Sequence, residues 1–302
     1  MPDPITRDTL DLEALRKPQG HKYDHGHALV LTGGPGRTGA ARLAARAALR
    51  IGAGAVTLGV PPAAQQEVAC QITALMLRRI PDAAALAQVL EDRRINALCL
   101  GPGLGTGADR GEIVAAALES GRACVLDADA LTLMASDPAL FARLHAGCVL
   151  TPHMGEFARL FPDIAPRLTA GPSFLRAEGL ARAADRAGCL VLLKGVETTL
   201  TAPGGAQWVH RATGDRAVPW LATAGAGDVL AGLVVGLMAR GLAPEKAAGL
   251  ATWLHVECAL SCGPGLIAED LPEALPRVLQ AACSTDPRAR AASAVPSSSP
   301  SA

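Results

Sequence analysis

Asp228 is the residue whose surroundings most clearly suggest chemistry. The stretch TAGAGDVLAGLVVG (residues 223–236) places it behind Gly225, Ala226 and Gly227 and ahead of an apolar helix. Backbone N–H groups that converge at a helix N-terminus favour a phosphate or a developing oxyanion. A carboxylate that only capped the helix would stabilise it by about 1 kcal/mol. A cap does not explain why the residues before Asp228 have almost no side chains, since the two glycines there cost backbone entropy on folding. We therefore predict that Asp228 transfers a proton beside an anion hole.

Lys194 ends LVLLK, the most apolar strand-like run of the chain. A lysine in a buried setting needs a charged partner, so either an anion lies near its ammonium group or the side chain extends to solvent. Gly195 allows a close backbone approach, and Thr198 offers a hydroxyl ligand. This segment is therefore a candidate binding site for an anionic ligand.

His153 follows another apolar run, in TPHMGEF. Its spacing from Glu156 puts both side chains on one side of a helix start. The segment either caps that helix or points the imidazole into a cleft at the end of the strand.

Two glycine-rich turns follow apolar runs, GGPGRTG at 33–39 and LGPGLGTG at 100–107. The first contains G-x-G-x-x-G, but the NAD fingerprint also needs an acid about 20 residues on, and the first acid after Asp24 is Glu67. We therefore predict no classical dinucleotide fold, and no G-K-[ST] follows either turn. The first turn remains suited to backbone contact with an anionic or amide group, and the second either ends a strand or approaches a ligand closely.

Short apolar runs without polar alternation are typical of parallel strands buried on both faces. We predict such strands at 27–34, 55–61, 96–103, 123–129, 148–153 and 189–195. Ala/Leu/Arg stretches at 39–51 and 109–121 have helical spacing, so the chain alternates β and α in right-handed crossovers. Ligands of such sheets bind beyond the carboxyl ends of the strands, where Asp127 and Asp129 also lie.

The rest of the chain is less regular. Residues 197–211 predict a hairpin. We expect helices at about 226–240, 244–262 and 270–282. Residues 1–19 would be a lead-in, of which 1–17 would form one helix against a neighbour, residues 20–283 the single domain, and residues 284–302, rich in Pro, Ser and Ala, a disordered tail.

Composition excludes several classes of protein. Lys plus Arg and Asp plus Glu number 28 each among 302 residues, which gives no electrostatic reason to expect nucleic acid or an anionic membrane as a partner. The eight cysteines contain no C-x-x-C pair, so we expect free, buried thiols in a reducing cytosol rather than disulfides or a zinc site, and we assign no residue as a metal ligand. The acidic N-terminus is not a signal peptide, and no apolar run spans a membrane. A cytoplasmic location is expected.

Taken in order, the motifs resemble the ADP-dependent NAD(P)H-hydrate dehydratases of the ribokinase-like superfamily. The resemblance runs from about residue 20 to 282 and rests on HKYDHGHALVLTGG, GAARLAARAALRIGAGAVTLGVPP, LGPGLG, VLDADAL, LTPHMGEFARL, VLLKGVETTL and TAGAGDVLAGLVVGLMARGLAPEKAA. It implies a three-layer α/β/α fold with a central, mostly parallel sheet and a short hairpin. The implied activity restores NADH and NADPH from their (6S) hydrates, NADHX and NADPHX, while ADP becomes AMP and phosphate.

The resemblance also assigns roles to residues. Ala40, Gly103 and His153 would contact the hydrated nicotinamide nucleotide, and Asp228 would face the hydrate. The adenine nucleotide would be bound by Lys194, Gly195, Val196, Glu197, Thr198 and Gly227. Mg²⁺, a homotetramer and a separate NAD(P)HX epimerase are further implications.

The residues suggest a mechanism for this activity. Transfer of the terminal phosphoryl group of ADP to the ring hydroxyl, with Asp228 as the base, turns a poor leaving group into phosphate. The run Ala224-Gly225-Ala226-Gly227-Asp228 is closer to the small-molecule kinases of the superfamily, so an ATP-dependent kinase of a vitamin precursor is the alternative. His153 stands where such kinases tend to have Asn, which favours the dehydratase. A nucleotide-binding regulator without catalysis is a third interpretation.

Overall fold

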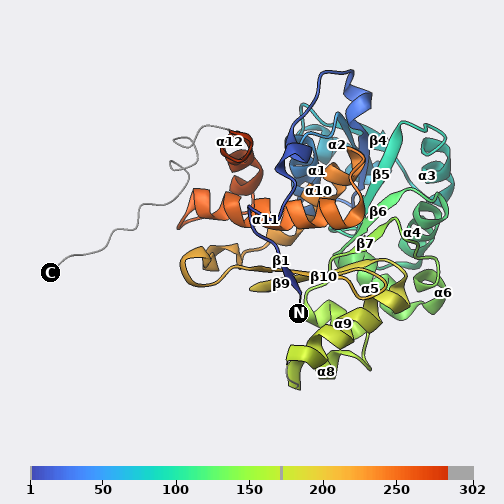
Figure 1. The fold of residues 1–302 in the computed structure, drawn as a ribbon. Helices are drawn as coiled ribbons and strands as arrows, with labels where there is room; N and C mark the ends of the chain where they lie inside the picture. Colours follow the sequence, from blue (N-terminus) through green and yellow to red (C-terminus); the bar gives the residue numbers. More distant parts are fainter. Residues whose placement is uncertain (1, 171–172, 285–302) are drawn as a thin grey trace.

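A ten-stranded sheet organises the chain, in the order β1-β10-β9-β8-β7-β6-β5-β2-β3-β4 (Figure 1). The computed structural model describes residues 2–170 and 173–284. The strands from β8 to β4 in this order run parallel, as the apolar runs predict. They are β2 (His27–Leu31), β3 (Ala55–Val60), β4 (Met76–Arg79), β5 (Ile95–Leu100), β6 (Ala123–Leu126), β7 (Cys148–Leu150) and β8 (Leu190–Leu193).

The predicted hairpin is present at one edge of the sheet. Its strands β9 (Glu197–Thr201) and β10 (Gln207–Arg211) are antiparallel to each other, and β9 is antiparallel to β8. This confirms a mostly parallel sheet with a short hairpin.

The single lead-in helix expected over 1–17 is wrong. Strand β1 (Asp3–Pro4) pairs with β10 at the edge of the sheet, where a proline without a backbone N–H is tolerated, and only Leu12–Leu15 forms a 3₁₀ turn. The guanidinium of Arg240 donates to the carbonyls of residues 14–16, so the lead-in packs on its own chain. Apart from Ser284, the expected disordered tail lies outside the described residues, and the division into domains stays a prediction.

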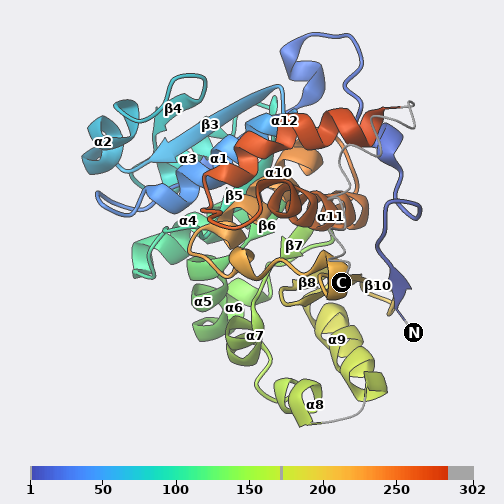
Figure 2. The same cartoon turned by 90° about the vertical axis from the view of Figure 1, so that its left-hand side faces the viewer.

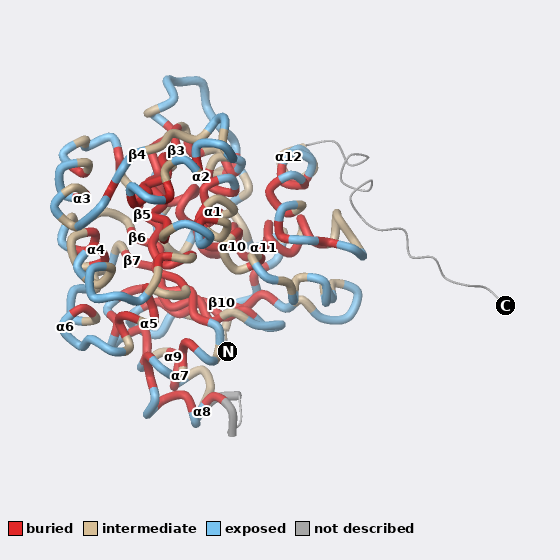
Figure 3. Tube along the Cα trace, turned by 180° about the vertical axis from the view of Figure 1, so that it is seen from behind, coloured by how far each residue is buried: buried red, intermediate tan, exposed pale blue. Residues whose placement is uncertain are grey.

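Helices cover both faces of the sheet, as the three-layer prediction requires (Figure 2). Figure 3 shows the sheet as a band of buried chain between two groups of helices. One face carries α1 (Gly39–Arg50), α10 (Ala226–Ala239), α11 (Pro244–Cys262) and α12 (Asp270–Cys283). The other carries α3 (Ala83–Val89), α4 (Ala108–Glu119), α5 (Ala128–Ser136), α6 (Pro138–Phe141), α7 (Met154–Leu160), α8 (Ala165–Ala170) and α9 (Ser173–Ala187). A short α2 (Gln65–Ala69) follows β3.

Glycines set the distance between α1 and α10. A Cβ on Gly232 would lie 2.2 Å from the carbonyl oxygen of Ala44, and one on Gly236 would lie 2.8 Å from the Cα of Ala48. Because neither glycine has a side chain, the two backbones pack in direct contact. This contact fixes the N-termini of both helices at the same edge of the sheet.

Two further expectations can be compared with the fold. All eight cysteines are free, and five of them are buried. Among the described residues, no helix is both long enough and apolar enough to cross a bilayer.

Candidate active site

Lys194 and Asp127 meet at the carboxyl edge of the sheet. Asp127 follows β6 and is 1% exposed, and its Oδ1 lies 2.7 Å from the Nζ of Lys194, which follows β8. Of the two interpretations of Lys194, the structure therefore supports a charged partner, and the partner is a carboxylate of the same chain. The ammonium group also lies 3.3 Å from the position of a Cβ on Gly227, so it faces the mouth of α10.

Asp228 occupies the first turn of α10 without acting as a cap. Gly225 precedes the helix with a left-handed φ of 89°, and no hydrogen bond to the Asp228 carboxylate is present among the described residues. Burial, followed by the negative charge of Asp127, raises the pKa of Asp228 to about 7, while the positive charge of Lys194 opposes the shift. A carboxyl group with this pKa exchanges protons readily at neutral pH, as a general base must.

His153 does cap α7, and it also lines a cavity. Its Nδ1 accepts hydrogen bonds from the backbone N–H groups of Gly155 and Glu156 at 2.9 and 3.2 Å, and the Glu156 carboxylate accepts one from the His153 N–H. The acceptor role of Nδ1 puts the ring proton on Nε2. Nε2 lies 3.4 Å from the Oε1 of Glu156, and the ring, which is 56% exposed, is accessible to a ligand.

The first glycine-rich turn is held by an acid from α2. Glu67 accepts hydrogen bonds from the N–H of Gly36 at 2.7 Å and from the hydroxyl of Thr38. These bonds, chiefly the one from Thr38, lower the pKa of Glu67. The anionic group that contacts the turn is therefore part of the protein itself. The sequence identified Glu67 only as an acid too far along for a ribose contact.

Ala40 and Gly103, both predicted to contact the hydrate, lie side by side. A Cβ on Gly103 would lie 2.4 Å from the carbonyl oxygen of Arg37 and 3.8 Å from the Cβ of Ala40. The N–H of Gly105 donates to Asp129 at 2.8 Å. The two glycine-rich turns thus form one wall, which has no room for a side chain at Gly103.

A cavity of about 740 Å³ adjoins the mouth of α10. Of the residues predicted to bind the nucleotide, Lys194, Gly195, Val196, Thr198 and Gly227 line it, together with His153. Ala226 and apolar side chains such as Val218, Leu221 and Leu230 complete much of its wall. Glu197 is not among the lining residues, and its side chain pairs with Arg211 at 2.8 Å on the exposed hairpin. A cavity with an apolar wall and a cation at one end suits a purine nucleotide.

Three polar residues of this cavity were missed in the sequence. His210 comes from β10, and Thr252 and His255 come from α11; all three are buried. Burial lowers the pKa of His255 to about 4, so the ring is neutral, and its Nε2 donates to the carbonyl of Ala226 at 2.9 Å. The Thr252 hydroxyl has no hydrogen-bond partner among the described residues. Thr252 and His255 are three positions apart, which puts them on one side of α11, but this spacing alone does not show that the side faces a cavity.

The chain was compared with known proteins. A family model described as Carb_kinase, NAD(P)H-hydrate dehydratase, matches residues 28–278. The bifunctional NAD(P)H-hydrate repair enzyme Nnr of Moorella thermoacetica is 37% identical over 279 residues, which cover 88% of this chain and 51% of that protein. This chain spans about half the length of the curated relatives it matches.

Solved structures agree with the fold. A ribokinase-like superfamily protein from Enterococcus faecalis superposes with a TM-score of 0.77 at 21% identity, covering 93% of this chain and 96% of that one. An ADP/ATP-dependent NAD(P)H-hydrate dehydratase from Bacillus subtilis, co-crystallised with ATP/Mg²⁺, gives 0.73 at 25% identity and covers 93% and 98%. The chain therefore has a ribokinase-like fold and belongs to the NAD(P)H-hydrate dehydratase family.

Proposed function

We propose that the protein dehydrates the (6S) hydrates NADHX and NADPHX back to NADH and NADPH, using ADP as co-substrate. The observation that carries the proposal is Asp228, a half-buried carboxyl group with no hydrogen-bond donor among the described residues and with a pKa of about 7. It adjoins the Asp127–Lys194 ion pair, and Gly225 at the start of the same helix lies against Leu43 of α1, the helix that carries Ala40. On this proposal, the ring hydroxyl and the terminal phosphate meet beside Asp228.

The chemistry follows from this arrangement. Asp228 accepts the proton of the ring hydroxyl while the hydroxyl oxygen bonds to the β-phosphorus of ADP. At the same time the bond between that phosphorus and the bridging oxygen breaks, and this oxygen leaves with AMP. The phosphate then leaves with the electrons of the carbon–oxygen bond, while the ring nitrogen donates its lone pair. Loss of a proton from the adjacent carbon restores the dihydropyridine. The oxygen of the hydrate thus leaves as part of phosphate, and overall the elements of water are transferred from the hydrate to ADP, which becomes AMP and phosphate.

Groups around Asp228 suit phosphoryl transfer. Lys194 and the amides of residues 225–227 place positive charge and N–H donors where charge develops on the phosphate. Mg²⁺ is commonly bound by one or two carboxylates together with nucleotide phosphates. Asp127, which has an oxygen not engaged by Lys194, fits that role and would hold the ion, which would neutralise phosphate charge.

The proposal includes the partners that the substrates require. Only the (6S) hydrate would be repaired here, so a separate epimerase would have to convert the (6R) form. The relatives named bifunctional repair enzymes are about twice as long as this chain, which supports a second activity in the same process. The homotetramer and the nucleotide contacts of Glu197 stay predictions.

A spectrophotometric assay tests the function. The protein is incubated with NADHX and either ADP or ATP, and the near-ultraviolet absorbance of reduced nicotinamide is followed together with AMP. We expect absorbance to return with ADP, with AMP formed in equal amount, and Asp228→Asn to abolish both. ATP-dependent phosphorylation of a vitamin precursor, with no recovery of absorbance, would instead identify a kinase. Recovery with ATP alone would reject ADP as the co-substrate.

A further inference from the structure

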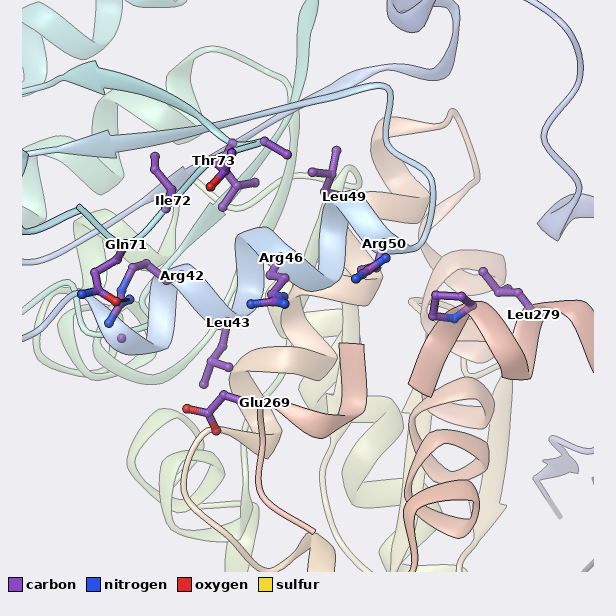
Figure 4. Close-up of a pocket in the computed structure, with 14 residues that line it drawn as sticks. Arg42, Leu43, Arg46, Leu49, Arg50, Gln71, Ile72, Thr73, Glu269 and Leu279 are labelled. Atoms are coloured by element: carbon purple, nitrogen blue, oxygen red, sulfur yellow. Dashed lines mark hydrogen bonds between the residues drawn. The ribbon is translucent and has the colours of Figure 1, made fainter. Parts of the chain in front are cut away.

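A second large cavity lies outside the site described above, along the outer face of α1 (Figure 4). It has a volume of about 720 Å³. Its walls come from α1, from residues 71–75 that follow α2, and from Glu269 and α12. We call it the α1 groove.

The α1 groove begins at the candidate active site. Gly39 lines it and directly precedes Ala40. Ala40 and Gly103 belong to the wall formed by the two glycine-rich turns, which we call the hydrate wall. Leu43 also lines it, and the Leu43 Cδ1 lies 2.7 Å from the position of a Cβ on Gly225, at the mouth of α10. The groove therefore adjoins the candidate active site at the N-terminus of α1 and the mouth of α10.

The lining combines an apolar floor with cations. Leu43, Leu49, Ile72, Leu75 and Leu279 supply apolar surface. Three arginines one turn apart, Arg42, Arg46 and Arg50, project from α1 (Figure 4). An apolar floor beside guanidinium groups is the chemistry that binds a nucleoside with its phosphates.

Arg42 is the arginine whose charge is available. Arg46 and Arg50 both pair with the Glu273 carboxylate, at 2.6 and 2.7 Å. Arg42 forms no ion pair within the described part of the chain; its Nη1 donates to Gln71, and its buried Nε has no partner. Of the three arginines of the groove, Arg42 is also the nearest in sequence to Ala40. An anion at this end of the groove would meet an unpaired guanidinium.

We propose that the α1 groove holds the adenosine half of the dinucleotide substrate and that Arg42 binds its pyrophosphate. This inference rests on the proposed function. The substrate has two nucleotide halves, of which only the nicotinamide half takes part in the reaction at Asp228. The cavity beside Lys194 is assigned to the co-substrate, so the second half needs an apolar cavity of its own that adjoins Ala40. Because both hydrates contain the pyrophosphate, Arg42 acts on NADHX and NADPHX alike.

Binding of NADPH, the product, tests the groove independently of turnover. We expect Arg42→Gln to weaken NADPH binding about tenfold in calorimetry, which is the effect of losing one charge-assisted contact. Ile72→Glu, which places a carboxylate on the apolar floor, should weaken it as well. Arg182→Gln, on α9 far from the groove, is the matched control. Equal NADPH affinity of wild type and Arg42→Gln would overturn the proposal.

Kinetics with a truncated substrate locate the contact. The KM for NADHX should rise about tenfold in Arg42→Gln, and the hydrate of dihydronicotinamide riboside, which lacks the pyrophosphate and adenosine, should show no such difference. A tenfold effect that persists with the riboside would place Arg42 at the nicotinamide end and reject the groove. If Ile72→Glu changes the oligomeric state and leaves NADPH affinity intact, the groove is a subunit interface, and the proposal fails. Arg42-dependent NADPH binding without any dehydration would preserve the groove and overturn the proposed function.

Discussion

The Nζ of Lys194 lies 2.7 Å from the Oδ1 of Asp127, and this ion pair adjoins Asp228 at the carboxyl edge of the sheet. The two partners act on Asp228 in opposite directions. Asp127 raises its pKa, and Lys194 lowers it. Burial makes the largest contribution to the raised pKa of the proposed base, and the ion pair beside it adjusts that pKa in both directions.

The first prediction concerns the pH dependence of activity. A base must be deprotonated, so kcat/KM for the hydrate should rise with pH through about 7, the pKa of Asp228. Lys194→Gln removes the positive charge that lowers this pKa, and the midpoint should move to higher pH. Lys246→Gln, an exposed lysine near Asp11, should leave it in place. An unshifted midpoint in Lys194→Gln would show that another group is titrating.

The second prediction concerns stability. The pKa of Asp228 is higher in the folded state than in the unfolded state, so its ionisation destabilises the fold increasingly as the pH rises from about 4 through 7. Asp228→Asn should therefore unfold at a higher denaturant concentration than wild type at pH 8, by at most about 4 kcal/mol. The difference should shrink towards zero below pH 4. Equal gains at both pH values would contradict a buried, ionising carboxyl group.

The third prediction concerns the glycine-rich turn. Glu67→Gln loses the charged acceptor of the Gly36 N–H and of the Thr38 hydroxyl, so the hydrate wall should loosen. The KM for NADHX should increase several-fold, while the KM for ADP stays constant because the nucleotide cavity lies on other strands. Steady-state kinetics measures both, with Glu178→Gln on α9 as the control. An equal rise in both KM values would indicate general misfolding.

The fourth prediction concerns Thr252. Its buried hydroxyl has no partner within residues 2–170 and 173–284, so Thr252→Val should raise the free energy of unfolding of the ligand-free protein by about 1 kcal/mol. If the hydroxyl bonds to the nucleotide, the same change should raise the KM for ADP several-fold. Thr201→Val removes another unpartnered buried hydroxyl outside the cavity, and it should stabilise the fold without changing that KM. Identical kinetics of the two variants would exclude a nucleotide contact.

The fifth prediction concerns the contact between α1 and α10. Gly232→Ala places a methyl group 2.2 Å from the Ala44 carbonyl oxygen, and we expect a loss of about 1–3 kcal/mol in denaturant unfolding. Gly111→Ala, in α4, meets no atom within 4 Å. It should stabilise the protein by about 0.4–1 kcal/mol, because only the unfolded chain loses freedom. Destabilisation by both changes would mean that helix glycines matter here for reasons other than packing.

The parallel strands could be predicted because burial on both faces makes each of them a short, continuous apolar run. The edge strand β4 was missed, since Met76–Arg79 ends in two exposed arginines that do not resemble a buried run. Asp228 and Lys194 could be found because glycines and apolar residues isolate them in the sequence.

Other contacts have no local signature. Glu67 is separated from Gly36 in sequence by α1 and β3, and only the fold brings the two together. Thr252 looked like any small residue of an apolar helix. The sequence could not show which polar side chains on α11 face a cavity, because that depends on how α11 packs against β9 and β10.

The close contact of α1 with α10 also affects how the protein is made. Ala40 is synthesised early, whereas Asp228 emerges only in the last third of the chain. Residues of α1, α10 and α11 share one hydrophobic core cluster, so the layer that carries Ala40 is completed only after α10 has been synthesised. On the proposed function, dehydration therefore requires that this late helix has docked on α1.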